Sequence, residues 1–388
     1  MATGHLENRY KSSWTIVIDA GIDPVTKERQ RIVKSVKGKK SLAQAEMTRM
    51  LNELEKGTYV EQTDLAFGEF MERWLADYAK GQVMPRTYER YKEIIDSRIV
   101  PELGKVPIAK LKPMHLQSFY SKLAADGRKD GREGGLSPTT IVQHHRIIHK
   151  ALETALRWQV VNRNVADAVD PPKKIKKEIK TLDMEQTRVL LLEVEKTNHH
   201  AMIYLASYTG MRRSELYGLR WQDIDFETGD MTIRRAAKYI RGKGVIFEGT
   251  KNKKGRPITL PESVLDALKK HKTNQAKDQL KAGGQWQDND LLFCQKDGSP
   301  SHPDTITKWF PKFLAKLKLP KITFHGLRHT HATLLLNMGV HPKVVSERLG
   351  HSQIGITMDI YSHVLPTLQR EATDKLEEQI LNKINKAK

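Results

Sequence analysis

The sequence predicts a multidomain protein that is mainly α-helical with small β-sheets. A length of 388 residues exceeds that of one ordinary domain and suggests two or three. Apolar residues alternate near the N-terminus, recur at steps of three and four from about residue 64, and form short strands between helices after about residue 230. We therefore expect a sheet-plus-helix domain at residues 1–62, a helical domain at 63–172 and a mixed α+β domain at 173–388 that ends in a tail helix.

The composition indicates a polyanionic partner. The formal net charge is +20 and the pI is near 9.7, which suits nucleic-acid binding but would also suit a ribosomal or membrane-surface protein. The single cysteine, Cys294, excludes an intrachain disulfide and a thiolate metal cluster. No apolar run approaches the roughly 20 residues of a membrane-spanning helix, and the N-terminus has no apolar signal core. We expect a cytoplasmic protein with no membrane partner.

The N-terminal domain is predicted to be a small sheet packed on one helix. Residues 13–19 alternate as a strand should, and residues 29–36 can pair with them across a turn at residues 21–24. Ser41 and Gln44 make a capping box that opens a helix. Its apolar face is formed by Ala43, Met47, Met50, Leu51 and Leu54. The second strand and its exit are crowded by Lys27, Arg29, Arg31, Lys34, Lys37, Lys39 and Lys40. These residues either guard a solvated strand edge or bind DNA.

The segment from residue 63 to 172 is predicted to form four or five helices. Its regularly spaced aromatic residues, such as Phe67, Phe70 and Trp74, are explained most simply as core. Ser137, followed by a proline, caps the last helix. The glycine-rich loop at residues 126–135 is a candidate backbone contact for DNA.

Residues 170–180 contain paired prolines followed by lysines, and they mark a domain boundary. This linker is either inert or in contact with phosphates. Beyond it we expect helices at residues 181–195, 199–208, 261–279, 303–318, 326–337 and 343–349. Short strands are expected at residues 231–233, 245–248 and 257–260.

Two stretches of the third domain concentrate reactive side chains. In Tyr-Thr-Gly-Met-Arg-Arg-Ser-Glu-Leu, Arg212 precedes Glu215 by about one helical turn. In the second stretch, Thr323 can cap a helix whose first turn places His325 and Arg328 side by side. Arginine presents a planar fork of donors that matches phosphate oxygens, and it stays charged at any working pH.

The second stretch continues with Leu-Gly-His351 and then with Tyr361-Ser-His363. A tyrosine near arginine forks is a candidate nucleophile. Each residue alone has a simpler explanation, because Arg212 could form a surface salt bridge and Tyr361 could be a buried residue that ends a helix. The presence of all the boxes in one chain favours the catalytic interpretation.

These boxes and their order resemble those of the tyrosine-type site-specific recombinases, in particular the integrases of temperate phages and conjugative elements. The resemblance is strongest from about residue 181 to residue 363 and weaker upstream. Carried over by position, it implies the catalytic residues Arg212, Lys251, His325, Arg328, His351 and the nucleophile Tyr361, with Glu215 supporting the first arginine. It also implies that the three domains are an arm-type DNA-binding domain, a helical core-binding domain and a catalytic domain.

The implied chemistry is transesterification at a phosphodiester. The two arginines would stabilise the charge that develops on the non-bridging oxygens. Lys251 would protonate the departing 5′ oxygen, although Lys253, Lys254 and Arg256 are equivalent by chemistry alone. The two histidines would donate to the phosphate or shuttle the proton of the nucleophile. Attack by Tyr361 leaves a 3′-phosphotyrosine, so neither a cofactor nor a metal is required.

Three rival interpretations fit this sequence less well. A zinc hydrolase is suggested by His325 and His329 at i and i+4, but the glutamate base of that motif is absent. A DNA-binding protein without catalysis would have no need for the full catalytic set. A type IB topoisomerase shares the chemistry but is usually a much larger chain, and it would relax DNA without strand exchange.

The resemblance implies integration and excision of a mobile element through a Holliday junction. The expected partner is double-stranded DNA with core and arm attachment sites, bound by a homotetramer because strand exchange needs four active sites. An excisionase and a host DNA-bending protein are further expected partners. DNA contacts are assigned to Arg29, Arg31, Lys34, Lys173 and Lys174. An apolar stripe in the tail, which either joins subunits or packs on its own domain, is formed by Leu368, Ala372, Leu376, Ile380 and Ile384.

Overall fold

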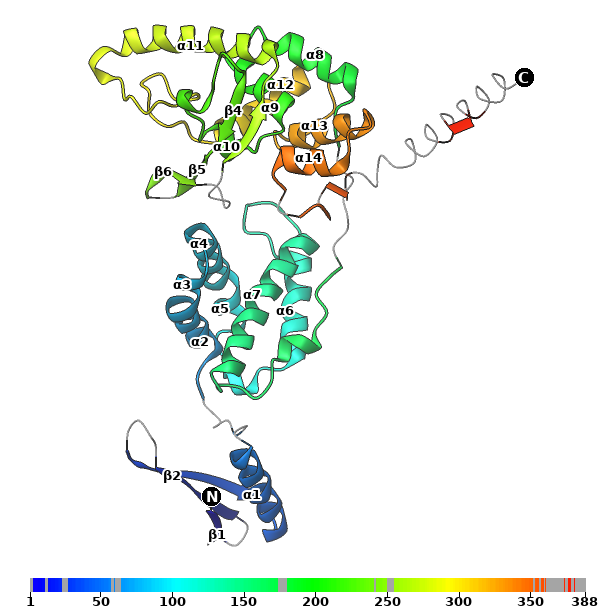
Figure 1. Cartoon of the computed structure of the whole chain (residues 1–388). Coiled ribbons are helices and arrows are strands. Elements are labelled where there is room, and N and C mark those ends of the chain that lie inside the picture. The colour runs from blue at the N-terminus through cyan, green and yellow to red at the C-terminus, as the bar shows by residue number, and fades with distance from the viewer. Residues whose placement is uncertain are drawn as a thin grey trace. The chain divides into compact units, whose positions relative to one another are not determined.

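The computed structural model divides the chain into two compact units, residues 1–176 and 177–388 (Figure 1). The structure describes residues 3–10, 13–22, 27–56, 59, 64–173, 180–240, 242–249, 255–351, 353–355, 357, 358, 360, 373, 376, 377 and 380. Within these ranges, no helix combines the length and the apolar character that a membrane span requires.

The first unit begins with a three-stranded antiparallel sheet in the order β1-β2-β3, with one helix against it (Figure 1). Its elements are β1 Thr3–Tyr10, β2 Ser13–Ile22, β3 Arg29–Lys37 and α1 Lys40–Glu55. Ile16 and Ile18 of β2 pack with Met47 and Met50 of α1. The predicted strand pair and helix are confirmed, whereas β1 was not predicted.

The predicted capping box at the start of α1 is wrong. The helix begins at Lys40, so Ser41 already lies inside its first turn. Lys39 is the N-cap residue, and no side chain caps the helix there. The apolar face of the helix, rather than a cap, therefore fixes its position on the sheet.

The rest of the first unit is a helical bundle with its own core. Its helices are α2 Phe67–Arg73, α3 Lys80–Gln82, α4 Pro85–Ile94, α5 Val100–Leu103, α6 Pro113–Asp126 and α7 Pro138–Arg157. Two π-helical segments, Trp74–Ala79 and Ile95–Ile99, join α2 to α3 and α4 to α5, and 3-10 turns lie at Ile108–Lys110 and Val165–Ala168. The first two predicted helices are therefore each a run of α-, π- and α-helical segments.

The bundle core confirms the interpretation of its aromatic residues. Phe67, Phe70 and Trp74 are at most 2% exposed and pack in one apolar cluster. The indole of Trp74 donates to the hydroxyl of Thr154 on α7 at 3.1 Å. The hydroxyl of Ser137 accepts from the backbone N–H of Thr140 at 3.3 Å, which confirms the predicted cap of α7.

The second unit is a mixed domain in which helices surround two small sheets. Its helices are α8 Met184–Val194, α9 His200–Thr209, α10 Arg213–Leu216, α11 Glu262–Ala282, α12 Asp304–Lys316, α13 Gly326–Asn337 and α14 Pro342–Leu349. Its strands are β4 Asp230–Ile233, β5 Arg235–Ile240, β6 Gly244–Gly249 and β7 Arg256–Thr259, and 3-10 turns lie at Trp221–Asp223 and Gly283–Gln285. The six predicted helices are confirmed within a few residues.

The strand pairing includes a strand that the sequence did not reveal. β4 pairs with β7, and β6 pairs with β5 in a second two-stranded sheet. The two alanines and two charged residues of β5 give it little β-propensity, so only its partner β6 makes it a strand. The predicted strand at residues 245–248 therefore pairs with a new neighbour and not with β7.

α9 is the central helix of this unit, because α8, α11 and α13 all contact it. Residues 201–206 of α9 are buried without interruption. The helix ends at Gly210 in the left-handed conformation, with φ of +62°. A Cβ at this position would lie 2.4 Å from Leu349 Cδ2, so only glycine lets the end of α9 approach α14.

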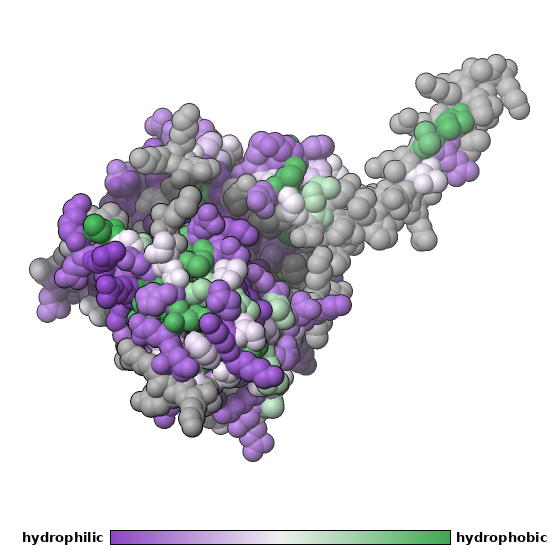
Figure 2. Space-filling view, turned by 90° about the horizontal axis from the view of Figure 1, so that it is seen from below, coloured by the Kyte–Doolittle hydropathy of each residue, from purple (hydrophilic) through white to green (hydrophobic). Residues whose placement is uncertain are grey.

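The surface is rich in charged side chains, as the net charge of +20 requires. Figure 2 shows a face that is largely hydrophilic, with apolar residues in small groups. Of the tail stripe, Leu376 and Ile380 are described and are 61% and 50% exposed. Leu368, Ala372 and Ile384 lie outside the described residues.

Candidate active site

Arg212 and Glu215 form the first part of the site, at the start of α10. The Glu215 carboxylate accepts the backbone N–H of Arg212 at 2.9 Å and its guanidinium Nη1 at 2.8 Å. The Arg212 side chain is 39% exposed, whereas the Glu215 side chain is 7% exposed. The buried carboxylate therefore holds a guanidinium that solvent, or a ligand, can still reach.

Arg328 and His325 form the second part, at the start of α13. The predicted Thr323 cap of α13 is wrong, because His325 is the N-cap residue and no side chain caps the helix there. The Thr323 hydroxyl instead accepts the Gly326 backbone N–H at 3.1 Å in the turn that leads into the helix. Arg328 is 3% exposed and donates to the carbonyls of Gly210 and Leu349, each at 2.8 Å. The ends of α9 and α14 thus fix this guanidinium.

The end of α14 brings the two parts together. The Leu349 carbonyl accepts from Arg328 and from Arg256, and the Gly350 carbonyl accepts from Arg212 Nη2 at 2.9 Å. These are the last carbonyls of a helix, which no backbone N–H of the helix satisfies and which carry the negative end of its dipole. Three arginines from three separate elements therefore converge on one turn.

The charges of the site perturb one another strongly. Burial would raise the pKa of Glu215, but the positive charges of Arg256 and Arg212 and the donated hydrogen bonds outweigh burial and hold this pKa below its ordinary value. Burial, together with the charge of Arg212, lowers the pKa of Arg328 to about 9. At neutral pH the site is thus one carboxylate among three cations, with a net positive charge that suits an anionic ligand.

The two predicted histidines lie within this field. Burial is the main cause that lowers the pKa of both His325 and His351 to about 4, and the charge of Arg328 adds to it. His351 Nδ1 lies 2.8 Å from the Thr357 hydroxyl, and the His325 ring meets the His329 ring edge-on, with centroids 5.0 Å apart. Both imidazoles are therefore neutral at pH 7 and can donate an N–H to an anionic ligand, although the lowered pKa makes each a weaker base than a free imidazole.

The structure brings together five of the seven residues that the sequence assigned to catalysis, namely Arg212, Glu215, His325, Arg328 and His351. Lys251 and Tyr361 lie outside the described residues. Ile360, which directly precedes Tyr361, is 6% exposed and packs with apolar residues of α13 and α14.

Sequence reasoning missed two contacts of the site. Arg256 appeared only as a chemical equivalent of Lys251, and Thr357 was not singled out. Arg256 begins β7 and follows a basic stretch of sequence, but no local pattern marked it as a residue of the site. No sequence pattern pointed to Thr357.

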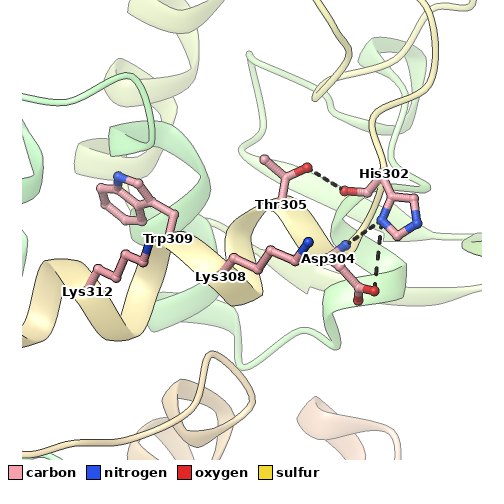
Figure 3. A pocket seen from close by; sticks show the side chains of 6 residues that line it. All are labelled: His302, Asp304, Thr305, Lys308, Trp309 and Lys312. Carbon is pink, nitrogen blue, oxygen red and sulfur yellow. Dashed lines mark hydrogen bonds and ion pairs between the residues drawn. The ribbon is translucent and has the colours of Figure 1, made fainter. Parts of the chain in front are cut away.

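Arg213 ties α10 to α12 beside the site. Its Nη1 donates to the Asp304 carboxylate at 2.6 Å and to the Thr307 hydroxyl at 2.5 Å. Asp304 also lines a hollow on α12 with Thr305, His302, Lys308, Lys312 and Trp309 (Figure 3). The hollow is separate from the convergent arginines, so we give it no catalytic part.

The basic residues of the N-terminal sheet divide between its two faces. Lys34 pairs in register with Ile16, faces α1 and donates to Glu46 at 2.8 Å. The assignment of Lys34 to DNA contact stays a prediction, and its ammonium is already paired with a carboxylate on the helix side of the sheet. Arg31 is exposed on the open face opposite Asp19, and Arg29 forms an ion pair with Asp19 at 2.7 Å.

Two residues of the linker are expected to contact DNA. Lys173 is exposed, and Lys174 lies outside the described residues.

Comparison with known proteins identifies the family. The model of the phage integrase family matches residues 180–367, which include the whole convergent site. The model of the phage integrase N-terminal SAM-like domain matches residues 66–124, in the helical bundle. The chain belongs to the phage integrase family. It is therefore a tyrosine recombinase, an enzyme class that cleaves and rejoins DNA strands.

Relatives extend this similarity over nearly the full length. A XerC-like tyrosine recombinase of Caldanaerobacter subterraneus subsp. tengcongensis is 29% identical over 97% of this chain and 98% of its own. The ICEBs1 integrase of Bacillus subtilis is 24% identical over 97% of this chain and 100% of its own.

Solved structures share the fold of this integrase-family chain. A Tn1549 transposon integrase in complex with transposon right end DNA has a TM-score of 0.67 and 22% identity, over 80% of this chain and 99% of that one. A lambda integrase dimer bound to a COC′ core site has a TM-score of 0.55 and 16% identity, over 92% of this chain and 94% of that one.

Proposed function

We propose that this protein integrates and excises a mobile DNA element through a 3′-phosphotyrosine intermediate and a Holliday junction. The observation that carries the proposal is the convergence of Arg212 and Arg328 on the end of α14, with His325 and His351 beside them. Such an arrangement supplies fixed positive charge and neutral imidazoles that can donate to a phosphate in one place. These are the requirements of phosphoryl transfer without a metal.

The arginines are proposed to stabilise the pentacoordinate transition state. Their donors already point at backbone carbonyls, so the guanidinium planes are oriented before any DNA arrives. Because Arg212 is the more exposed of the two, it is proposed to meet the phosphate first. Preorganised donors of this kind need no reorganisation as charge develops on the non-bridging oxygens.

Tyr361 is proposed as the nucleophile and Lys251 as the acid that protonates the leaving 5′ oxygen. The burial of Ile360 against α13 and α14 supports this role, because it anchors the preceding residue to the helices that carry Arg328 and Leu349. His351 or His325 is proposed to take the phenol proton once the negative charge of a bound phosphate raises the pKa of the imidazole, which is lowered without DNA.

Double-stranded DNA is the proposed partner, in a homotetramer on paired core sites. The Tn1549 and lambda integrases were solved in complex with DNA, which supports this partner. The N-terminal sheet is proposed to bind the arm sites, and the helical bundle is proposed to bind the core sites. Lys173 and Lys174 of the linker are proposed to contact DNA phosphates between these sites. An excisionase and a host DNA-bending protein are proposed to decide between integration and excision. The C-terminal tail is proposed to join protomers, and the complex is proposed to act in the cytoplasm.

The proposal predicts recombination that needs no metal and no nucleotide. A plasmid that carries both element junctions should resolve into two circles on incubation with the purified protein in chelator. The physical reason is that the phosphotyrosine conserves the energy of the broken phosphodiester. Relaxation of the plasmid without exchange would favour a topoisomerase, and cleavage that depends on magnesium would favour a metal-dependent nuclease.

The two faces of the N-terminal sheet predict opposite results for two basic residues. Arg31→Ala should weaken binding to arm-site DNA and lower the log-log salt slope by about 1, because one phosphate contact is lost. Lys34→Ala is the matched control, since this side chain is engaged by Glu46 on the covered side. Binding titrations at several salt concentrations would measure both slopes. Equal slopes for the two variants would argue against the open face as the arm-binding surface.

A further inference from the structure

Arg256 connects the two halves of the site although the catalytic pattern does not include it. Its side chain is 16% exposed, and Nη2 lies 3.1 Å from Glu215 Oε2. Nη1 donates to the Leu349 carbonyl, which Arg328 also contacts at 2.8 Å. Glu215 in turn holds Arg212. One guanidinium therefore touches the group that orients each of the two arginines proposed for catalysis.

We propose that Arg256 is a positioning residue for strand cleavage. It keeps Glu215 ionised and holds the Leu349 carbonyl in place, and through these two groups it aims Arg212 and Arg328 at the phosphodiester. The inference rests on the proposed function, because it assigns a part in that same reaction. Arg256 acts through its neighbours and does not itself have to touch DNA.

The local backbone is built to admit this guanidinium. Gly350 has φ of +65°, and a Cβ there would lie 2.0 Å from Arg256 Nη1. Any other residue at position 350 would therefore displace the Arg256 fork from the end of α14. Arg256 also begins β7, whose pairing with Ile233 of β4 fixes its backbone. Because Glu215 and the Leu349 carbonyl each bind one nitrogen of the guanidinium, Arg256 fixes the orientation of both groups as well as supplying positive charge.

The charges around Glu215 should make the pH dependence of cleavage sensitive to Arg256. Glu215 is faced by Arg256 from β7, by Arg212 at the start of α10 and by Arg328 from α13. Without Arg256, burial would act against fewer positive charges, so the pKa of the carboxyl would rise. A protonated Glu215 accepts hydrogen bonds poorly and would release Arg212. Cleavage should then fail at a higher pH than in the wild type.

The test compares three variants of the full-length chain. Single-turnover formation of the covalent adduct on a nicked core-site duplex is measured from about pH 3.5 to about pH 9, with DNA binding and thermal unfolding measured alongside. Arg256→Gln should lower the rate by about 100-fold and move the acidic limb of the profile up by about one pH unit. Arg256→Lys keeps the positive charge but not the bidentate guanidinium. The rate of adduct formation should therefore fall, while the acidic limb of the pH profile stays where it is in the wild type.

Arg348→Gln is the matched control. Arg348 is also a half-buried arginine near Arg256, but its Nη2 donates to the Tyr208 carbonyl at 3.1 Å. This variant should lose stability and keep the wild-type pH limb. If the acidic limbs of Arg256→Gln and Arg348→Gln lie at the same pH, Arg256 contributes only to folding and does not position the site.

Two further outcomes keep the result decisive. If Arg256→Gln does not fold, Arg256→Lys carries the test, and a wild-type rate for that variant would overturn the inference. If the wild-type protein itself forms no adduct, the proposed function fails and not the role of Arg256. A wild-type adduct with unchanged Arg256 variants would remove only the positioning role.

Discussion

Replacement of Tyr361 by phenylalanine is expected to abolish covalent capture of DNA while folding and DNA binding persist. Only one oxygen is removed, and the affinity for DNA comes mainly from phosphate contacts elsewhere. The measurement uses a nicked core-site duplex from which a short fragment diffuses away after cleavage, so that the wild-type protein stays attached at the 3′ side of the break. The reaction is run in chelator and without nucleotide. The Tyr361→Phe protein should bind this duplex and yield no adduct.

The loss should be complete because the reaction depends on one activated hydroxyl. An unperturbed tyrosine has a pKa of about 10, so about one molecule in a thousand carries the phenolate at neutral pH. That deficit corresponds to roughly 4 kcal/mol. The cations around Glu215 can offset it, because positive charge favours the phenolate. Phenylalanine has no hydroxyl oxygen that could attack the phosphorus.

Tyr239 supplies the control for this experiment. Its side chain is 41% exposed in the same unit and lies against the His302 ring, with centroids 4.2 Å apart. Tyr239→Phe should form the adduct at the wild-type rate. Peptide mapping of the wild-type adduct should identify Tyr361, and an adduct on Tyr208, Tyr217 or Tyr239 would falsify the assignment of the nucleophile.

The parts of this molecule that were predictable from sequence are those set by local spacing. Arg212 and Glu215 meet because one helical turn separates them, and the same holds for His325 and Arg328. The aromatic core of the helical bundle was predictable in the same way, because its residues recur at steps of three and four along the sequence. None of these inferences required knowledge of a distant contact.

The parts that were missed depend on partners far away in the sequence. β5 is a strand only because β6 pairs with it. Arg256 belongs to the site only because α10 and α14 come to the start of β7. Lys34 falls on the covered side of its sheet because of the register with Ile16, which a charge count cannot show. Long-range pairing, and not residue type, decided each case.

Arg212→Ala and Arg328→Ala are expected to lose cleavage to a similar degree but stability to different degrees. Each removes one preorganised cation, so adduct formation should fall by about 100- to 1,000-fold in both variants. Most DNA binding should remain, because these charges act chiefly as the transition state forms. Single-turnover adduct formation and a binding titration would separate the two effects.

The difference in stability follows from what each side chain leaves behind. Arg328 is 3% exposed and donates to the carbonyls of Gly210 and Leu349. Without it, Leu349 keeps Arg256 as a donor, but the buried Gly210 carbonyl loses its donor, so the removal should cost about 1–3 kcal/mol. Arg212 is 39% exposed, and Glu215 keeps Arg256 as a partner without it, so Arg212→Ala should cost less than about 1 kcal/mol. Denaturant unfolding of the full-length proteins measures both. If Arg212→Ala were the less stable variant, or cleaved at the wild-type rate, the exposed arginine would not be the one presented to the phosphate.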